Sequence, residues 1–133
     1  MTVAELMQRD VRPVGSDSRV KELVVTLADA HVSGVPVVDG GGRVIGVVST
    51  SDVLTAQAET DDPDARRELV EHTAVRDIMT PRPFTVSPDD DIREAARQML
   101  YADVHRLFVT AGEKVVGVIS TTDIVRAVAN GKL

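Results

Sequence analysis

Hydrophobic residues follow two different spacings along this chain, and the spacings predict which segments are helices and which are strands. Between residues 17 and 30 they recur every three or four positions, which predicts an amphipathic helix. Residues 34–38 and 44–48 are instead short valine-rich runs joined by DGGGR, a strong β-hairpin signal. A further helix is expected to begin near residue 50 and to fade between residues 57 and 62.

This order of elements occurs twice, since residues 3–38 align with residues 75–110 at a constant offset that changes by one residue in the glycine turn. Each copy opens with a short helical turn and a brief extended piece, which are residues 3–7 and 13–14 in the first copy. The equivalents expected in the second copy are residues 75–79, 85–86, 90–102, 105–110, 115–119 and 121–130. A charged helical linker, residues 63–73, joins the two.

An internal repeat of this length indicates one structural unit used twice, because neither copy alone covers its own apolar surface. We therefore predict an α+β fold with two domains, residues 1–62 and residues 63–133. The interface between two such copies is a natural place for a binding cleft.

The most closely repeated phrase stands between a predicted strand and a predicted helix, as GVVSTSD at residues 46–52 and as GVISTTD at residues 117–123. Its glycine has no side chain to block a ligand. Its aspartate can accept two hydrogen bonds at once, which suits the paired hydroxyls of a ribose, and the helix N-terminus beside it suits a phosphate. A serine three residues before an acid is also an ordinary helix cap that needs no ligand. Both interpretations can hold together.

Composition narrows the alternatives. The 133 residues are 43% hydrophobic but only 2% aromatic, so the core must be mostly aliphatic, and the lack of cysteine excludes disulfides and thiolate sites. A formal net charge of −6 disfavours nucleic-acid binding. The acidic clusters at residues 59–64 and 89–91 are interpreted as linker and helix-start residues rather than as a metal site. No apolar run reaches the ~20 residues of a membrane span, and no signal segment is evident, so a soluble cytoplasmic protein that starts at its own initiator is expected.

Several motifs in fixed order resemble CBS domains, the family named for cystathionine β-synthase. They are SGVPVVD at residues 33–39, RDIMTP at residues 76–81, FTV at residues 84–86, and the two GVxSTxD phrases. A tandem pair of such domains is called a Bateman module, and the resemblance covers about residues 3–130. It implies a β-α-β-β-α fold for each copy, packed around a pseudo-twofold axis with a cleft on each side. Such pairs commonly bind AMP, ADP or ATP, and some bind S-adenosylmethionine.

The resemblance also implies site residues. Asp52 and Asp123 match the ribose-binding position, and the nearby hydroxyl positions match Ser49, Ser51, Ser120 and Thr122. Adenine recognition maps to Thr85, Val86 and Leu107, and more weakly to Val14 and Val35, all of which are equally expected as core residues. Other basic residues that could reach a phosphate are Arg9, Arg12, Lys21 and Arg82.

The two copies differ where a phosphate would bind. The second copy has His105 and Arg106 at the head of its strand, where the first copy has Ser33 and Gly34. Arg106 offers a planar fork of donors for phosphate oxygens, and His105 adds a donor whose charge depends on pH. The alternative is a solvated pair at a strand start. We expect a phosphorylated ligand to prefer the second copy. Phe108 stands where the first copy has Pro36, which could reshape this cleft.

An enzyme is not predicted, because the three histidines, His31, His72 and His105, show no nucleophile or metal spacing. The main hypothesis is a regulatory module without a required cofactor, which senses an adenosyl ligand and signals to an unidentified partner protein. The alternative is a ligand-free module used for dimerisation or scaffolding. Amphipathic helix faces within residues 23–27, 92–100 and 124–128 predict a homodimer.

Overall fold

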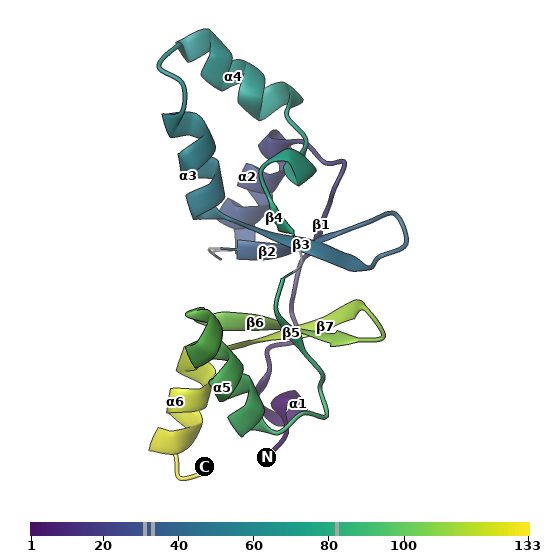
Figure 1. Ribbon diagram of the computed structural model, residues 1–133, viewed down its shortest axis with the longest axis vertical. Coiled ribbons are helices and arrows are strands. Elements are labelled where there is room, and N and C mark those ends of the chain that lie inside the picture. The colour runs from purple at the N-terminus through teal and green to yellow at the C-terminus, as the bar shows by residue number, and fades with distance from the viewer. Residues whose placement is uncertain (31, 33, 82) are drawn as a thin grey trace. The chain divides into compact units, whose positions relative to one another are not determined.

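A computed structural model describes residues 1–30, 32, 34–81 and 83–133 of the chain (Figure 1). His31, Ser33 and Arg82, which the sequence analysis named, therefore lie outside the described residues. The elements in chain order are α1 (Val3–Leu6), β1 (Val14–Gly15), α2 (Val20–Ala30), β2 (Gly34–Val38), β3 (Val44–Ser49), α3 (Thr50–Ala58), α4 (Pro63–His72), the 3₁₀ helix η1 (Val75–Asp77), β4 (Thr80–Pro81), β5 (Thr85–Val86), α5 (Ile92–Ala102), β6 (Arg106–Ala111), β7 (Lys114–Ser120) and α6 (Thr121–Ala129).

The strands form two separate sheets. The first has the order β1-β2-β3-β4 and the second the order β5-β6-β7. In each sheet the short first strand runs parallel to the next strand, which forms an antiparallel hairpin with the strand after it. Helices α2 and α3 cover one face of the first sheet, and α5 and α6 cover one face of the second (Figure 1). The predicted α+β fold with two repeats is confirmed.

The first hairpin turn is built by its own side chains. Asp39 accepts hydrogen bonds through Oδ1 from the backbone N–H groups of Gly41 and Arg43, at 2.9 and 3.0 Å. Gly42 has φ of 81°, a left-handed conformation that glycine adopts without steric cost. The glycine-rich run that predicted the hairpin therefore has a direct geometric role.

The compact units differ from the sequence repeats. One unit is residues 12–83, and the other combines residues 1–11 with residues 84–133. The opening segment of each repeat thus joins the sheet of the other repeat. Thr80 pairs with Val47 in one unit, and Gln8 pairs with Val118 in the other. The predicted boundary between residues 62 and 63 separates the two sequence copies. The compact units instead divide the chain after residue 11 and after residue 83.

The repeated glycines make this exchange possible. A Cβ atom on Gly46 would lie 2.9 Å from the carbonyl oxygen of Thr80, and one on Gly117 would lie 2.7 Å from that of Gln8. A methionine sulfur, from Met79 in one unit and from Met7 in the other, occupies the same space. The sequence analysis interpreted these glycines as leaving room for a ligand. That interpretation is wrong, because the space that a Cβ atom would need is already occupied. Their side-chain space is filled by the crossing segment of the same unit.

Each unit has its own aliphatic core, as the composition predicted. Val3, Val86, Ile92, Leu107 and Ile119 are buried in the core of the unit with the C-terminal strands. The other core is formed by Val14, Leu23, Leu27, Val35, Val37, Val48 and Val75. No helix among the described residues is long and apolar enough to cross a bilayer.

Candidate functional site

Both repeated phrases form complete helix caps. Ser49 is the N-cap of α3, where its backbone N–H and its hydroxyl donate to Oδ2 of Asp52 at 2.8 and 3.1 Å. Ser120 is the N-cap of α6 and donates in the same way to Oδ2 of Asp123, with both distances 2.9 Å. The hydroxyl of each serine accepts the backbone N–H of its aspartate in return. The capping interpretation of the sequence is therefore confirmed in both copies.

The other oxygen of the two aspartates is used differently. Oδ1 of Asp123 accepts a hydrogen bond of 3.2 Å from Nε2 of Gln8, and lies 3.7 Å from Nη1 of Arg126. Asp123 is only 8% exposed and is the one buried charged residue in the part of the chain that the structure describes. Asp52 is half-buried, and no described side chain donates to its Oδ1.

Sequence reasoning missed Gln8 and Arg126 as partners of Asp123. Arg126 could have been found, because it follows Asp123 by one helical turn. Gln8 precedes Asp123 by 115 positions in the sequence. Only the exchange of opening segments brings the two together, so the sequence carried no signal for this contact.

The predicted phosphate residues lie beside the cap of α6. Arg106 is the register partner of Ser120 across the β6–β7 hairpin, and the carbonyl oxygen of His105 accepts the backbone N–H of Thr121 at 2.9 Å. His105 is exposed and Arg106 is half-buried. The described residues include no ion-pair partner for Arg106. Thr122 is exposed in the first turn of α6.

The first copy has the equivalent hairpin register with a different residue at the strand head. Gly34 pairs with Ser49 where Arg106 pairs with Ser120, so this strand head carries no basic group. Ser51 is exposed in the first turn of α3, as Thr122 is in α6. The two copies thus provide one polar helix start each, and the strand head beside it carries a guanidinium in the second copy and a glycine in the first.

The residues predicted to hold adenine occupy strands next to these caps. Thr85 is half-buried and pairs with Phe108. The side chains of Val86 and Leu107 belong to one core, and those of Val14 and Val35 to the other. Since those valines and Leu107 are committed to packing, a nearby base would meet mainly their backbone groups.

The remaining charged candidates have structural roles or lie on the surface. Asp62 caps α4, and Asp91 caps α5, as the helix-start interpretation predicted. Two hydrogen bonds from Arg93 lower the pKa of Asp91 from its ordinary 3.8 to about 2. The bond from the side chain has the larger effect, and the bond from the backbone N–H has the smaller one. Among the described residues, no group of three or more His, Asp or Glu is placed to hold a metal ion. The predicted phosphate candidates Arg9, Arg12 and Lys21 are exposed.

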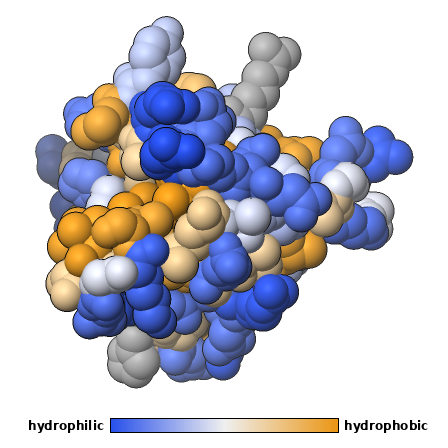
Figure 2. All heavy atoms as spheres, turned by 90° about the horizontal axis from the view of Figure 1, so that it is seen from below, coloured by the Kyte–Doolittle hydropathy of each residue, from blue (hydrophilic) through white to orange (hydrophobic). Residues whose placement is uncertain are grey.

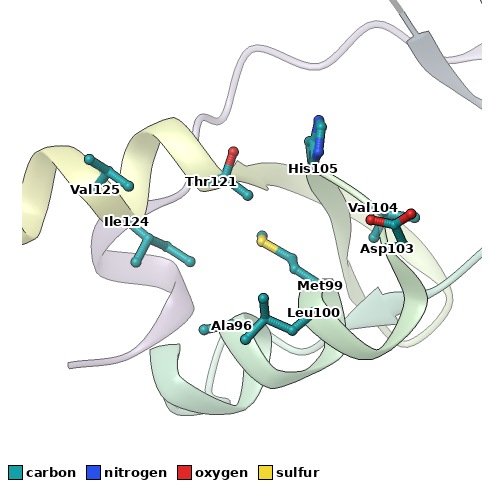
Figure 3. A pocket seen from close by; sticks show the side chains of 9 residues that line it. All are labelled: Ala96, Met99, Leu100, Asp103, Val104, His105, Thr121, Ile124 and Val125. Carbon is teal, nitrogen blue, oxygen red and sulfur yellow. The ribbon is translucent and has the colours of Figure 1, made fainter.

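Each unit also has an apolar pocket between its two sheet-covering helices. The larger, about 510 Å³, lies between α5 and α6, and His105 and Thr121 are at one end of it (Figure 3). The smaller, about 350 Å³, lies between α2 and α3. Their linings correspond position by position, with Met99 and Ile124 in one where Leu27 and Val53 are in the other.

Comparison with known proteins identifies the repeat. The family model for the CBS domain matches residues 3–59 and again residues 75–130. CBS domain-containing protein CBSX2 of Arabidopsis thaliana, a chloroplastic protein, is 29% identical over 149 residues, which cover 95% of this chain and 63% of CBSX2. The chain spans 41% to 78% of the length of three such curated relatives.

Solved structures share the fold. The crystal structure of CBSX2 in complex with AMP superimposes with a TM-score of 0.79 at 29% identity, covering 99% of this chain and 98% of that one. The CBS domain pair of protein MJ0100, solved with 5′-methylthioadenosine and S-adenosyl-L-methionine, gives a TM-score of 0.82 at 20% identity, with 99% and 98% covered. At 20% identity the second likeness shows the fold alone. Because the family model covers most of the chain in two successive copies, this protein belongs to the CBS domain family and contains a tandem pair of CBS domains.

Proposed function

We propose that this chain is a regulatory module that binds an adenine nucleotide of the AMP, ADP or ATP type and signals to a separate protein. One observation carries the proposal: the half-buried Arg106 lies opposite Ser120, at the start of a helix whose first turn holds Asp123. A guanidinium, a helix N-terminus and a carboxylate together match a phosphate joined to a ribose. The likeness to CBSX2, whose crystal structure contains AMP, supports the same ligand class.

In this proposal the second copy is the principal site for phosphorylated ligands. Arg106 and His105 bind the phosphate, Asp123 binds the ribose hydroxyls, and the first copy provides a weaker site around Asp52. S-adenosylmethionine is an alternative ligand that needs no phosphate contact. The full set of proposed ligand-binding residues is His105, Arg106, Ser120, Thr122, Asp123, Thr85 and Val86 in the second copy, with Ser49, Ser51, Asp52 and Val14 in the first.

Thermal unfolding with AMP, ADP, ATP and S-adenosylmethionine tests binding. A ligand at 100 times its dissociation constant stabilises the folded protein by about 2.7 kcal/mol, which is easily seen as a rise in melting temperature. If none of the four raises the midpoint at millimolar concentration, the proposed function is wrong.

Calorimetry on Arg106→Ala then tests the phosphate contact. This variant should bind AMP and ATP more weakly than the wild type and adenosine almost equally well, because adenosine has no phosphate. Arg97→Ala is the matched control, since Arg97 is an exposed arginine on α5 that pairs with Glu94. Equal losses for AMP and adenosine in Arg106→Ala would contradict the assigned role.

A second proposal is that the chain pairs as a homodimer through its sheet-covering helices. The observation that favours it is apolar side chains left in solvent: Leu100 is 83% exposed, Leu54 68% and Val125 65%. Figure 2 shows that hydrophobic side chains gather into a patch on the visible face. Exposed apolar patches mark interaction sites, and closed twofold pairs are the commonest oligomers.

Light scattering tests pairing. The wild type should have the mass of a dimer at micromolar concentration, and Leu100→Glu should lower it toward that of a monomer. A wild-type monomer at that concentration would refute the pairing. A dimer that binds no adenosyl ligand would instead favour a structural scaffolding module over a sensor.

A further inference from the structure

Gln8 occupies the same backbone position in its unit as Thr80 does in the other. Gln8 pairs with Val118, and Thr80 pairs with the equivalent residue Val47. The side chains differ in reach, because the longer amide of Gln8 donates to Oδ1 of Asp123 at 3.2 Å. No described hydrogen bond joins Thr80 to Asp52.

This difference decides how much acceptor capacity each carboxylate has left. A carboxylate has about four lone-pair sites on its two oxygens. Asp123 receives two hydrogen bonds from Ser120 on Oδ2 and one from Gln8 on Oδ1, and Arg126 lies 3.7 Å from the same Oδ1. One acceptor site therefore remains on Oδ1, so a ribose can place both of its hydroxyls on Asp123 only if one of them takes the place of the Gln8 amide.

We propose that Gln8 is an internal competitor for the ribose hydroxyls at Asp123, and that it sets the affinity and ribose dependence of the second copy. The inference rests on the proposed function, since it concerns the same site. A bound ribose replaces the Gln8 amide at Oδ1, so each binding event includes the loss of one charge-assisted hydrogen bond. Among the described residues of the first copy no side chain donates to Oδ1 of Asp52, so in this proposal Asp52 accepts a ribose without displacing one of them.

The competition is confined to one side chain. The backbone of Gln8 is held by two hydrogen bonds to Val118, with N–H to carbonyl at 2.8 Å in one direction and 2.9 Å in the other. These bonds do not involve the amide side chain, so the segment of residues 1–11 stays docked when the amide turns away. Replacing the side chain therefore removes the competitor and keeps the architecture.

Calorimetric titration with AMP on the wild type, Gln8→Met and Gln8→Ala tests the inference. Methionine keeps the length of glutamine and lacks the amide donor. Since a hydrogen bond to a charged group is worth roughly 1.5 kcal/mol or more, either variant should bind AMP about tenfold more tightly in the second copy. Adding Asp123→Asn to Gln8→Met should abolish the gain. Thr80→Ala is the matched control in the other unit and should change AMP affinity by less than about twofold.

The outcomes separate the inference from the proposed function. If AMP binds neither the wild type nor the Gln8 variants, the proposed function fails. If AMP binds the wild type and both Gln8 variants bind it no more tightly, the competition is overturned while the nucleotide site stands. Weaker binding by both variants, with unchanged melting temperatures, would also overturn it, because Gln8 would then be a ligand contact. Two variants are used so that a packing effect of one replacement is recognised.

Discussion

The two CBS repeats of this chain have the same strand-to-helix cap and surround its aspartate with different side chains. Each aspartate completes a cap with a serine three residues earlier. Asp123 is then enclosed by Gln8 and Arg126 and has Arg106 on the neighbouring strand, whereas Asp52 has Gly34 nearby and a free outer oxygen among the described residues. The cap stabilises the start of the following helix in both copies. The residues around the cap differ between the copies, so the two aspartates have different chemical surroundings.

The largest expected difference between the copies is in nucleotide affinity. Asp123→Asn should weaken AMP binding by about 1.5 to 3 kcal/mol, because the ribose hydroxyls lose a charged acceptor. Asp52→Asn should have the smaller effect, since the first copy has Gly34 in the place of Arg106, the proposed phosphate contact. Calorimetry on both variants measures this. If Asp52→Asn abolishes binding and Asp123→Asn does not, the principal site is in the first copy.

Replacing either repeated glycine by alanine should destabilise the fold, because in both copies a crossing segment packs closely against the glycine. Gly117→Ala and Gly46→Ala each place a Cβ under 3.0 Å from a backbone carbonyl oxygen, so each should destabilise the fold by about 1 to 3 kcal/mol. Gly117→Ala should cost more, because its carbonyl contact is the shorter. Chemical denaturation gives both values. Gly34→Ala is the control, as its Cβ would come no closer than 3.4 Å to any heavy atom, and a loss equal to that of Gly117→Ala would contradict the steric explanation.

Removing the cap serines should have an intermediate effect. Ser120→Ala and Ser49→Ala should each lower the free energy of unfolding by about 0.5 to 2 kcal/mol. The loss should be greater for Ser120, because Asp123 is buried and water replaces the missing hydroxyl less readily than at Asp52. Denaturant unfolding measures both, and the exposed neighbours Thr122→Ala and Ser51→Ala should stay within about 0.5 kcal/mol of the wild type. A larger loss for Ser49→Ala would reverse the predicted order.

The smallest expected difference between the two copies is in their stability at acidic pH. Asp91 caps α5 in the second copy, while the aligned residue at the start of α2 is Arg19. Because the folded-state pKa of Asp91 is about 2 and its ordinary value is 3.8, its contribution to stability is present above pH 3.8 and is lost as the pH falls toward 2. An NMR titration should show the low midpoint, and Arg93→Gln should move it back toward 3.8. An unchanged midpoint in that variant would show that the side chain of Arg93 is not the cause.

The order of helices and strands could be predicted from the sequence because each depends on local chemistry. Residues 34–38 and 44–48 were predicted as strands, and the structure gives β2 as Gly34–Val38 and β3 as Val44–Ser49. The three-residue spacing of Ser49 and Ser120 from an aspartate gave a cap as one of two compatible interpretations, and both serines act as caps. Valine-rich runs, glycine turns and cap spacing are read over a few residues, so they require no knowledge of distant neighbours.

Contacts between residues far apart in the sequence were decided only by the tertiary structure. The sequence placed Gly46 and Gly117 beside a ligand, whereas packing places Met79 and Met7 at their Cβ positions. The contact between Gln8 and Asp123 depends on the opening segment of the first repeat docking on the strands of the second. A repeat in sequence records which segments are alike, and it does not record which copy of a segment packs on which sheet. That choice is made by long-range packing, and here it determines what surrounds the acid of each site.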